Sequence, residues 1–323
     1  MAELFLLKRL SLARNIVAAT SLLHEIYVIT ENSVTVDVYF CHRPYQLKNR
    51  VAIGNMASTD IATSYADVSV YALDSRNVCI WRIHRKLKKT TKHALNIGPE
   101  EVLKSMSITK SGAIVVVLSG NGIVLYNPVD GKTARIYLEG ASLSKDGIAH
   151  AAEFGDGCLL ACNGTQMFVY DLKREEVCKA MNVCGNHIAL KNSKTAVITD
   201  KIGQQLRMLD METWETTEVN VRRNGLWGVP PSHVHCAMEN GLLLVAWKNY
   251  LHVYSFDELD LESHLADTDT AETRNEAASS QNAVGVCHIR LTVPFAFTII
   301  TGFKVNFLIF LRITRLNRPK MHT

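Results

Sequence analysis

The residues of this chain best suited to chemistry are two histidines close to position 234. His233 and His235 alternate along a short apolar run, and Cys236 follows them. Side chains two positions apart on a strand share a face, so the two imidazoles could approach one metal ion. No third or fourth ligand follows at a spacing typical of metal sites. The sequence therefore predicts no bound metal, and we expect both histidines to be ordinary strand residues.

A basic segment at residues 82–93 is a candidate for binding polyanions. Its basic members are Arg82, Arg85, Lys86, Lys88, Lys89 and Lys92. Such a cluster could contact phosphates of nucleic acid or an anionic membrane surface. The alternative is a solvated edge strand, where lysines discourage edge-to-edge aggregation. Aromatic residues do not alternate with these charges, so nucleic acid is not the expected partner.

A second candidate surface combines tryptophan and arginine, the residue types enriched in binding hot spots. Its members are Trp214, Arg222, Arg223 and Trp227. They follow one of the repeated units described below and are candidates for binding a protein partner. The alternative is that a tryptophan there packs between neighbouring units.

Sequence motifs of enzymes are missing. Gly131-Lys132-Thr133 resembles the end of a phosphate-binding loop, but Tyr126 stands where the first glycine is needed, and a strand pattern follows in place of a helix. The chain has no G-x-S-x-G, H-E-x-x-H or G-x-G-x-x-G motif. We therefore predict no catalytic residues, no cofactor and a non-enzymatic function.

The composition is that of a globular protein with a large core. The chain has 323 residues, of which 47% are hydrophobic and 20% charged, with a formal net charge of +4. Nothing in this balance requires a nucleic-acid partner. The eight cysteines form no C-x-x-C pair, which favours buried thiols in a reducing compartment.

The dominant pattern is a repeated hairpin. In residues 113–132, two apolar β-branched runs flank Gly120-Asn121-Gly122, the kind of turn that joins antiparallel strands. Six such hairpins end on a large apolar residue or shortly after one. The closing positions are Tyr39, Trp81, Tyr126, Tyr170, Leu209 and Tyr254, in steps of 42, 45, 44, 39 and 45 residues. A period of 40–45 residues with four strand-like runs per unit predicts an all-β propeller of four-stranded antiparallel blades.

The unit resembles a degenerate WD repeat, in which a strand ending in Trp-Asp closes the hairpin. The matching dipeptides are Trp81-Arg82, Tyr126-Asn127, Tyr170-Asp171, Leu209-Asp210 and Tyr254-Ser255. The Gly-His dipeptide common in that family is absent. The resemblance implies a cytoplasmic interaction scaffold. The array of repeats also resembles the sensor propeller of NACHT-type signalling proteins, but this sequence contains no ATPase portion.

The predicted domain organisation has three parts. Blades one to six occupy residues 1–256, an acidic flexible loop follows at 257–282, and a seventh blade lies at 283–313. Glu3–Lys8 is a candidate outer strand for that closing blade. The alternative for 284–313 is a hydrophobic membrane anchor, which would make the protein membrane-associated. Lys304 interrupts this apolar segment, which fits a blade better than a membrane span.

The function favoured by these patterns is a scaffold or sensor whose loops bind protein or peptide partners. One alternative is polyanion or membrane-surface binding through residues 82–93. Another is an enzyme with its site in the central channel, which would need polar residues on the innermost strands. The runs expected there, such as Ile61-Ala-Thr-Ser and Ile188-Ala-Leu, look apolar and small. We therefore do not expect a catalytic channel.

Overall fold

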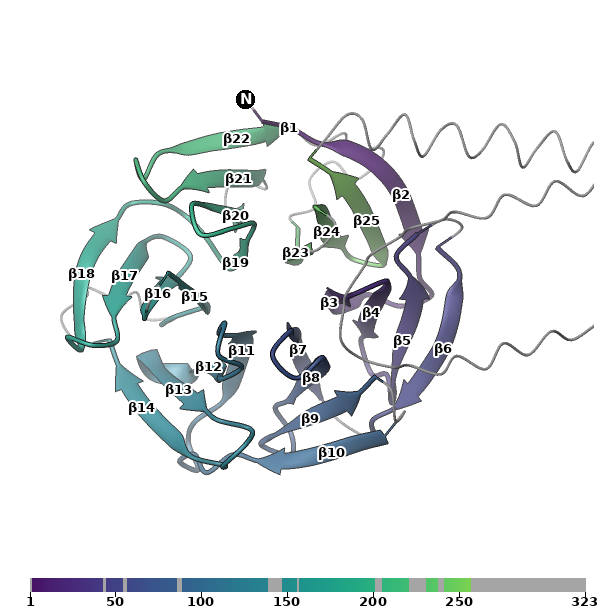
Figure 1. Cartoon of the computed structure of the whole chain (residues 1–323), viewed down its shortest axis with the longest axis horizontal. Coiled ribbons are helices and arrows are strands. Elements are labelled where there is room, and N and C mark those ends of the chain that lie inside the picture. Colours follow the sequence, from purple (N-terminus) through teal and green to yellow (C-terminus); the bar gives the residue numbers. More distant parts are fainter. Residues whose placement is uncertain are drawn as a thin grey trace, which may run out of the picture. The chain divides into compact units, whose positions relative to one another are not determined.

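The computed structural model describes residues 2–42, 45–54, 57–85, 89–138, 147–155, 157–200, 205–220, 231–237 and 241–256. Six blades, each built on four antiparallel strands, are arranged in a ring, and one of them carries β1 (Ala2–Glu3) as an additional parallel strand (Figure 1). The β-propeller predicted from the repeat is confirmed.

The blades follow one another in chain order. Blade 1 consists of β3 (Ile16–Leu22), β4 (Glu25–Thr30), β5 (Thr35–Phe40) and β6 (Leu47–Ala52). Blade 2 consists of β7 (Ser58–Ser64), β8 (Ser69–Asp74), β9 (Cys79–His84) and β10 (Lys89–Ala94). Blade 3 consists of β11 (Leu103–Ile108), β12 (Ile114–Leu118), β13 (Gly122–Tyr126) and β14 (Thr133–Tyr137).

Blades 4 and 5 repeat this order, and blade 6 departs from it. Blade 4 consists of β15 (His150–Phe154), β16 (Cys158–Cys162), β17 (Met167–Asp171) and β18 (Glu176–Met181). Blade 5 consists of β19 (His187–Leu190), β20 (Thr195–Asp200), β21 (Gln205–Asp210) and β22 (Thr216–Asn220). Blade 6 consists of β23 (His233–Ala237), β24 (Leu242–Trp247), β25 (Tyr250–Ser255) and the N-terminal β2 (Phe5–Ser11).

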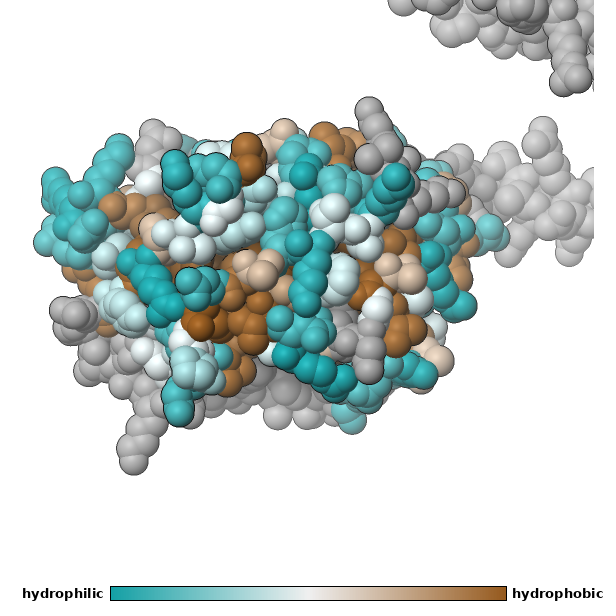
Figure 2. Space-filling view, turned by 90° about the horizontal axis from the view of Figure 1, so that it is seen from below, coloured by the Kyte–Doolittle hydropathy of each residue, from teal (hydrophilic) through white to brown (hydrophobic). Residues whose placement is uncertain are grey.

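Burial explains the composition of the strands. Every residue of β12 is buried, because neighbouring blades cover both faces of a middle strand. The outermost strand β14 of the same blade is mostly exposed and carries Thr133 and Arg135. The side of the ring accordingly presents hydrophilic residues interspersed with apolar ones (Figure 2).

The hairpin of residues 113–132 has the turn expected from its glycines. A short 3-10 turn, η1 (Ser119–Asn121), joins β12 to β13, and Gly120 has a φ of 74°. Gly131 has a φ of 71° in the next turn, where the backbone N–H of Asn127 donates to the carbonyl of Lys132 at 2.9 Å. Strand β14 follows at once. The phosphate-loop-like Gly131-Lys132-Thr133 is therefore a hairpin turn and not the start of a helix.

The closing tyrosines occupy equivalent places, as the repeat predicts. Tyr126, Tyr170 and Tyr254 lie at or next to the ends of β13, β17 and β25, the third strands of their blades. All three side chains are buried.

The N-terminal segment closes the ring on blade 6. Strand β2 pairs antiparallel with β25, and the preceding β1 (Ala2–Glu3) pairs parallel with β22 of blade 5. The chain from residue 233 to residue 255 contributes only three strands to blade 6, namely β23, β24 and β25. Strand β2 therefore pairs with the outer edge of β25 as the fourth strand. Strand β23 packs against β3 of blade 1. The described ring therefore closes with six blades.

The predicted seventh blade at 283–313, the acidic loop at 257–282 and the membrane-anchor alternative at 284–313 lie outside the described residues. Among the residues that are described, no helix is long and apolar enough to cross a membrane.

Candidate functional site in the central channel

Polar side chains from four blades meet at the centre of the ring. Asp60 comes from β7, His150 from β15, His187 from β19, and His233 and His235 from β23. The runs Ile61-Ala-Thr-Ser and Ile188-Ala-Leu are small and mostly apolar as expected, but the inference that the channel therefore lacks several titratable residues is wrong. Each strand carries only one or two of these residues, so no single run of the sequence looked polar.

Asp60 is the best-anchored member of this group. The pairing of β7 with β8 shifts register between Ser58 and Asp60, and such bulges re-aim side chains. The backbone N–H groups of Ile61 and Met106 donate to the two Asp60 carboxylate oxygens, each at 2.8 Å. Nε2 of His233 lies 3.1 Å from Asp60 Oδ1. The Asp60 side chain is thus fixed from three inner strands.

Three imidazoles stack beside this carboxylate. The ring centroids of His150 and His187 are 3.9 Å apart, and those of His187 and His233 are 4.1 Å apart. His187 Nε2 lies 3.9 Å from Asp60 Oδ2, which is too long for a hydrogen bond. Asp60, His150 and His187 each offer one potential metal-ligand atom, and these three atoms lie within 4.8 Å of one another.

Burial sets the protonation of the group. Burial raises the pKa of Asp60, but the neighbouring imidazoles of His187 and His233 outweigh it, and the pKa lies below the ordinary range. Burial lowers the pKa of His187 to about 4 and that of His235 to about 3. Burial also lowers the pKa of His150. At neutral pH the channel thus holds the ionised carboxylate of Asp60 and the neutral imidazoles of His150, His187 and His235.

A second set of polar contacts links blades 6, 1 and 2. Ser21 Oγ on β3 lies 3.1 Å from His235 Nε2. Thr20 Oγ1 lies 3.0 Å from Thr63 Oγ1 on β7. His235 therefore contacts the neighbouring inner strand and stands apart from the stacked rings.

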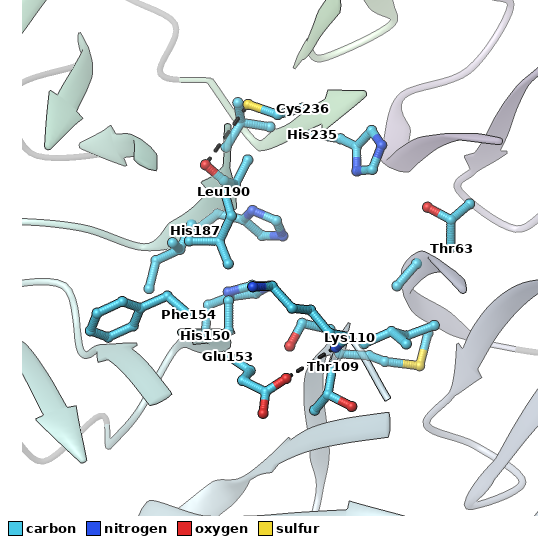
Figure 3. A pocket seen from close by; sticks show the side chains of 18 of the residues that line it. Thr63, Thr109, Lys110, His150, Glu153, Phe154, His187, Leu190, His235 and Cys236 are labelled. Atoms are coloured by element: carbon cyan, nitrogen blue, oxygen red, sulfur yellow. Dashed lines mark hydrogen bonds between the residues drawn. The ribbon is translucent and has the colours of Figure 1, made fainter. Parts of the chain in front are cut away.

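Two chambers flank the stacked histidines. The first, of about 310 Å³, is lined by residues along the inner strands, from strand starts such as His150 to positions just beyond the strand ends such as Asn192. Figure 3 shows His150, His187 and His235 lining this chamber together with Phe154 and Leu190. The second, of about 510 Å³, is lined by residues at and before the strand starts, such as Asn186 and Ser232. His187 and His233 border both chambers, so they lie between the two ends of the channel.

The first chamber combines apolar walls with a few polar groups at its rim. Ile108, Phe154 and Leu190 contribute apolar surface. Near them, the backbone N–H of Lys110 donates to Glu153 Oε2 at 3.0 Å. Apolar walls with a small number of placed polar groups are typical of ligand sites.

The basic residues of the 82–93 segment divide into two groups. Arg82 Nη2 lies 2.7 Å from Asp67 Oδ2, and Arg85 Nε lies 2.7 Å from Glu25 Oε2. Both arginines thus pair with acidic residues of the fold. Lys89 and Lys92 are exposed on the outermost strand β10. Lys86 and Lys88 lie outside the described residues, and polyanion binding by this segment stays a prediction.

Trp214 packs between blades. Its ring meets Phe154 of blade 4 edge-to-face at a centroid distance of 5.8 Å, and Lys179 Nζ lies 4.6 Å from its centroid. The other members of the predicted protein-binding group lie outside the described residues. They are Arg222, Arg223 and Trp227. Binding of a protein partner by these four residues therefore stays a prediction.

Sequence reasoning found two of the five channel residues. The alternation of His233 and His235 was the signal, and both lie on β23 as expected. Asp60, His150 and His187 were missed, because they come from three other blades and are at least 37 residues apart in the chain. Only the ring closure brings them together.

Comparison with known proteins supports the fold alone. No protein-family model and no curated protein matches the chain. Among solved structures, it is similar to the WD40 β-propeller domain of Doa1, with a TM-score of 0.59 and 11% identity over 80% of this chain and 98% of that one. It is also similar to a catalytically inactive histidine-to-alanine variant of virginiamycin B lyase from Staphylococcus aureus with quinupristin. There the TM-score is 0.57, with 12% identity over 77% of this chain and 98% of that one. Neither is a NACHT-type protein, so that part of the resemblance has no support. The chain is a six-bladed β-propeller resembling WD40 domains.

Proposed function

We propose that this propeller is a non-enzymatic binding module for a protein partner. In this proposal an extended peptide segment of the partner crosses the mouth of the channel and inserts one apolar side chain into the 310 Å³ chamber. The observation that carries the proposal is the chamber itself, with apolar walls from Ile108, Phe154 and Leu190. The likeness to a WD40 domain agrees with this class of function, but by analogy of fold.

The size of the chamber supports a side chain as the ligand. A volume of about 310 Å³ is at the lower end of the range for ligand pockets, which is ~300–1,000 Å³. Polar groups at the rim, including Thr63, Lys110 and Asn192, are placed to meet the backbone of a peptide. A buried apolar anchor within a polar rim is the usual anatomy of an interface.

An enzyme is the second candidate, because the channel holds an acid–imidazole pair and the second structural neighbour is a lyase variant. General acid–base catalysis works best when the pKa of the group lies near the working pH. The pKa values of His187 and His235 lie at about 4 and 3, which makes both imidazoles weak bases. This protonation favours binding over proton transfer by these residues.

The proposal is tested by selecting peptides from a displayed random library on the full chain and measuring their affinity by fluorescence anisotropy. We expect selected peptides to share one large apolar residue. The variant Ala62→Phe places a ring in the chamber, since Ala62 lines it. This variant should weaken binding at least about tenfold, the loss of one well-buried anchor contact.

The matched control is Ala94→Phe, the same substitution on the exposed outer strand of the same blade. It should leave the affinity unchanged. Peptides that bind wild type and Ala62→Phe equally would contradict binding in the chamber.

A further inference from the structure

An apolar side chain bound in the chamber does not account for the polar residues Asp60, His150 and His187 at the centre of the channel. Asp60 and His150 are each only 2% exposed, and the side chain of His187 is 13% exposed. Among the ion pairs of the described residues, only imidazoles pair with Asp60. A carboxylate in such surroundings is costly unless a positive charge compensates it.

Buried ring nitrogens without partners point to a missing ligand. Neither nitrogen of His187 has a hydrogen-bond partner within the described residues, and Nδ1 of His150 has none either. His150 is only 2% exposed, so bulk water does not satisfy this atom. Buried polar atoms are normally paired, and unpaired ones call for an unseen ion or water.

The spacing of the three residues fits a metal ion after small side-chain movements. Their potential ligand atoms lie within 4.8 Å of one another, and the pair His187 Nε2 and Asp60 Oδ2 is at 3.9 Å. Tetrahedral zinc with bonds of ~2.0–2.1 Å separates its ligand atoms by about 3.3 Å. Rotations that bring the most distant of these atoms closer by up to about 1.5 Å would therefore complete the geometry.

Neighbouring groups already orient two of the three ligands. The backbone of Met106 lies within hydrogen-bonding reach of the His150 ring, and Nδ1 is the nitrogen left without a partner. Asp60 Oδ1 is held by Ile61 N–H and His233, and Oδ2 accepts a hydrogen bond from Met106 N–H and lies 3.9 Å from His187 Nε2. A carboxylate oxygen has two lone pairs, so Oδ2 can accept this hydrogen bond and still coordinate a metal ion. Such outer contacts are typical of metal sites, where they fix the tautomer and direction of each ligand.

We propose that Asp60, His150 and His187 bind one divalent transition metal ion of the zinc class at the centre of the channel. Imidazole and carboxylate ligands together favour such an ion over calcium or magnesium. Three protein ligands leave a fourth position for water or for an atom of a bound partner. The site departs from the expectation of no metal and is independent of the proposed peptide binding.

The test is metal titration of the full chain after treatment with a chelator. Zn²⁺ affinity is measured by competition with a chromogenic chelator, and Co²⁺ coordination by visible absorption. We expect one equivalent of Zn²⁺ per chain, and Co²⁺ bands that Zn²⁺ displaces. The variants His187→Ala and Asp60→Asn should each weaken binding by at least about 100-fold, since even loss of an outer-shell contact typically costs 10–100-fold.

A surface pair provides the control. His24 and His42 are exposed with ring centroids 6.5 Å apart and could bind zinc adventitiously. The variant His24→Gln should retain the full stoichiometry and affinity. Loss of binding in His24→Gln, or unchanged affinity in His187→Ala, would overturn the proposal.

Folding of each variant is checked by circular dichroism. If neither channel variant folds, the wild type still decides the question through X-ray absorption of its zinc complex. Two imidazoles and one carboxylate around a single zinc ion support the site. No zinc bound to the folded wild type at micromolar concentration rules it out.

Discussion

At the scale of single residues, Glu25 shows how the basic segment serves the fold. Its side chain is buried and accepts hydrogen bonds from Tyr27, Lys48 and Arg85. Arg85 belongs to blade 2, so the ion pair ties blade 2 to blade 1. Burial raises the pKa of Glu25, but hydrogen bonds from Lys48, Tyr27 and Arg85 outweigh it and lower the pKa.

This arrangement predicts an acid-dependent loss of stability. A lowered carboxyl pKa in the folded state stabilises the fold above the unfolded pKa, and this contribution is lost as pH falls through the folded value. The variant Glu25→Gln should be less stable at pH 7 by about 1–3 kcal/mol, because charged hydrogen bonds are removed. Its free energy of unfolding should also fall less steeply than that of wild type below about pH 4.5.

The measurement is urea unfolding of both proteins between pH 3 and 7. The exposed Glu100 provides the control, and Glu100→Gln should follow the wild-type profile. Parallel pH profiles for wild type and Glu25→Gln would show that the ion pair does not stabilise the fold.

At the scale of strands, the tyrosines that end the third strands mark the packing between blades. Tyr170 on β17 is 5% exposed and belongs to a core cluster with Val115 and Ile123 of blade 3. Tyr137 on the outer strand β14 is 51% exposed. The two tyrosines therefore test burial with the same substitution.

We expect Tyr170→Ala to lower the free energy of unfolding by about 3–5 kcal/mol, since it removes a packed aromatic ring. Tyr137→Ala should cost less than about 1 kcal/mol. Denaturant unfolding measures both. A loss below about 1 kcal/mol for Tyr170→Ala would mean that the strand register is wrong.

Strand β2 provides the closure of the ring, and its burial pattern gives a sharp test. Leu7 is buried in a cluster with Leu251 and Val253, whereas the neighbouring Lys8 is exposed. A charge at Leu7 should release β2 and leave the edge of β25 unpaired. Leu7→Asp should therefore aggregate or become sensitive to protease, and Lys8→Asp should behave like wild type. Size-exclusion chromatography and limited proteolysis distinguish these outcomes, and a monomeric, protease-resistant Leu7→Asp would contradict the closure.

For the whole ring, the strands of the blades could be predicted from the sequence, whereas the residues that meet in the central channel could not. Each hairpin is encoded locally, by two apolar runs and a short turn, so the predicted closing residues Tyr126, Tyr170 and Tyr254 lie at or next to the ends of the third strands. The number of blades depends on which edge strand closes the ring. The sequence favoured seven, because it could not show that β2 completes blade 6.

The channel escaped prediction for a related reason. His150 and His187 each begin an inner strand and are followed by small or apolar residues, so neither indicates a site by itself. A β-bulge directs Asp60 into the channel, and no sequence motif predicts this bulge. Function at the centre of a propeller is assembled from single residues of many repeats, and only the closed ring reveals it.

Binding of a peptide in the chamber is tested most directly by mapping where a selected peptide touches the full chain. The peptide carries a photoreactive group on its apolar anchor residue, and the cross-linked positions are identified by mass spectrometry. The proposed binding mode predicts cross-links to chamber residues such as Phe154, Leu190 and Ile108, and their loss in Ala62→Phe. Cross-links confined to the outer strands, with none in the chamber, would contradict it.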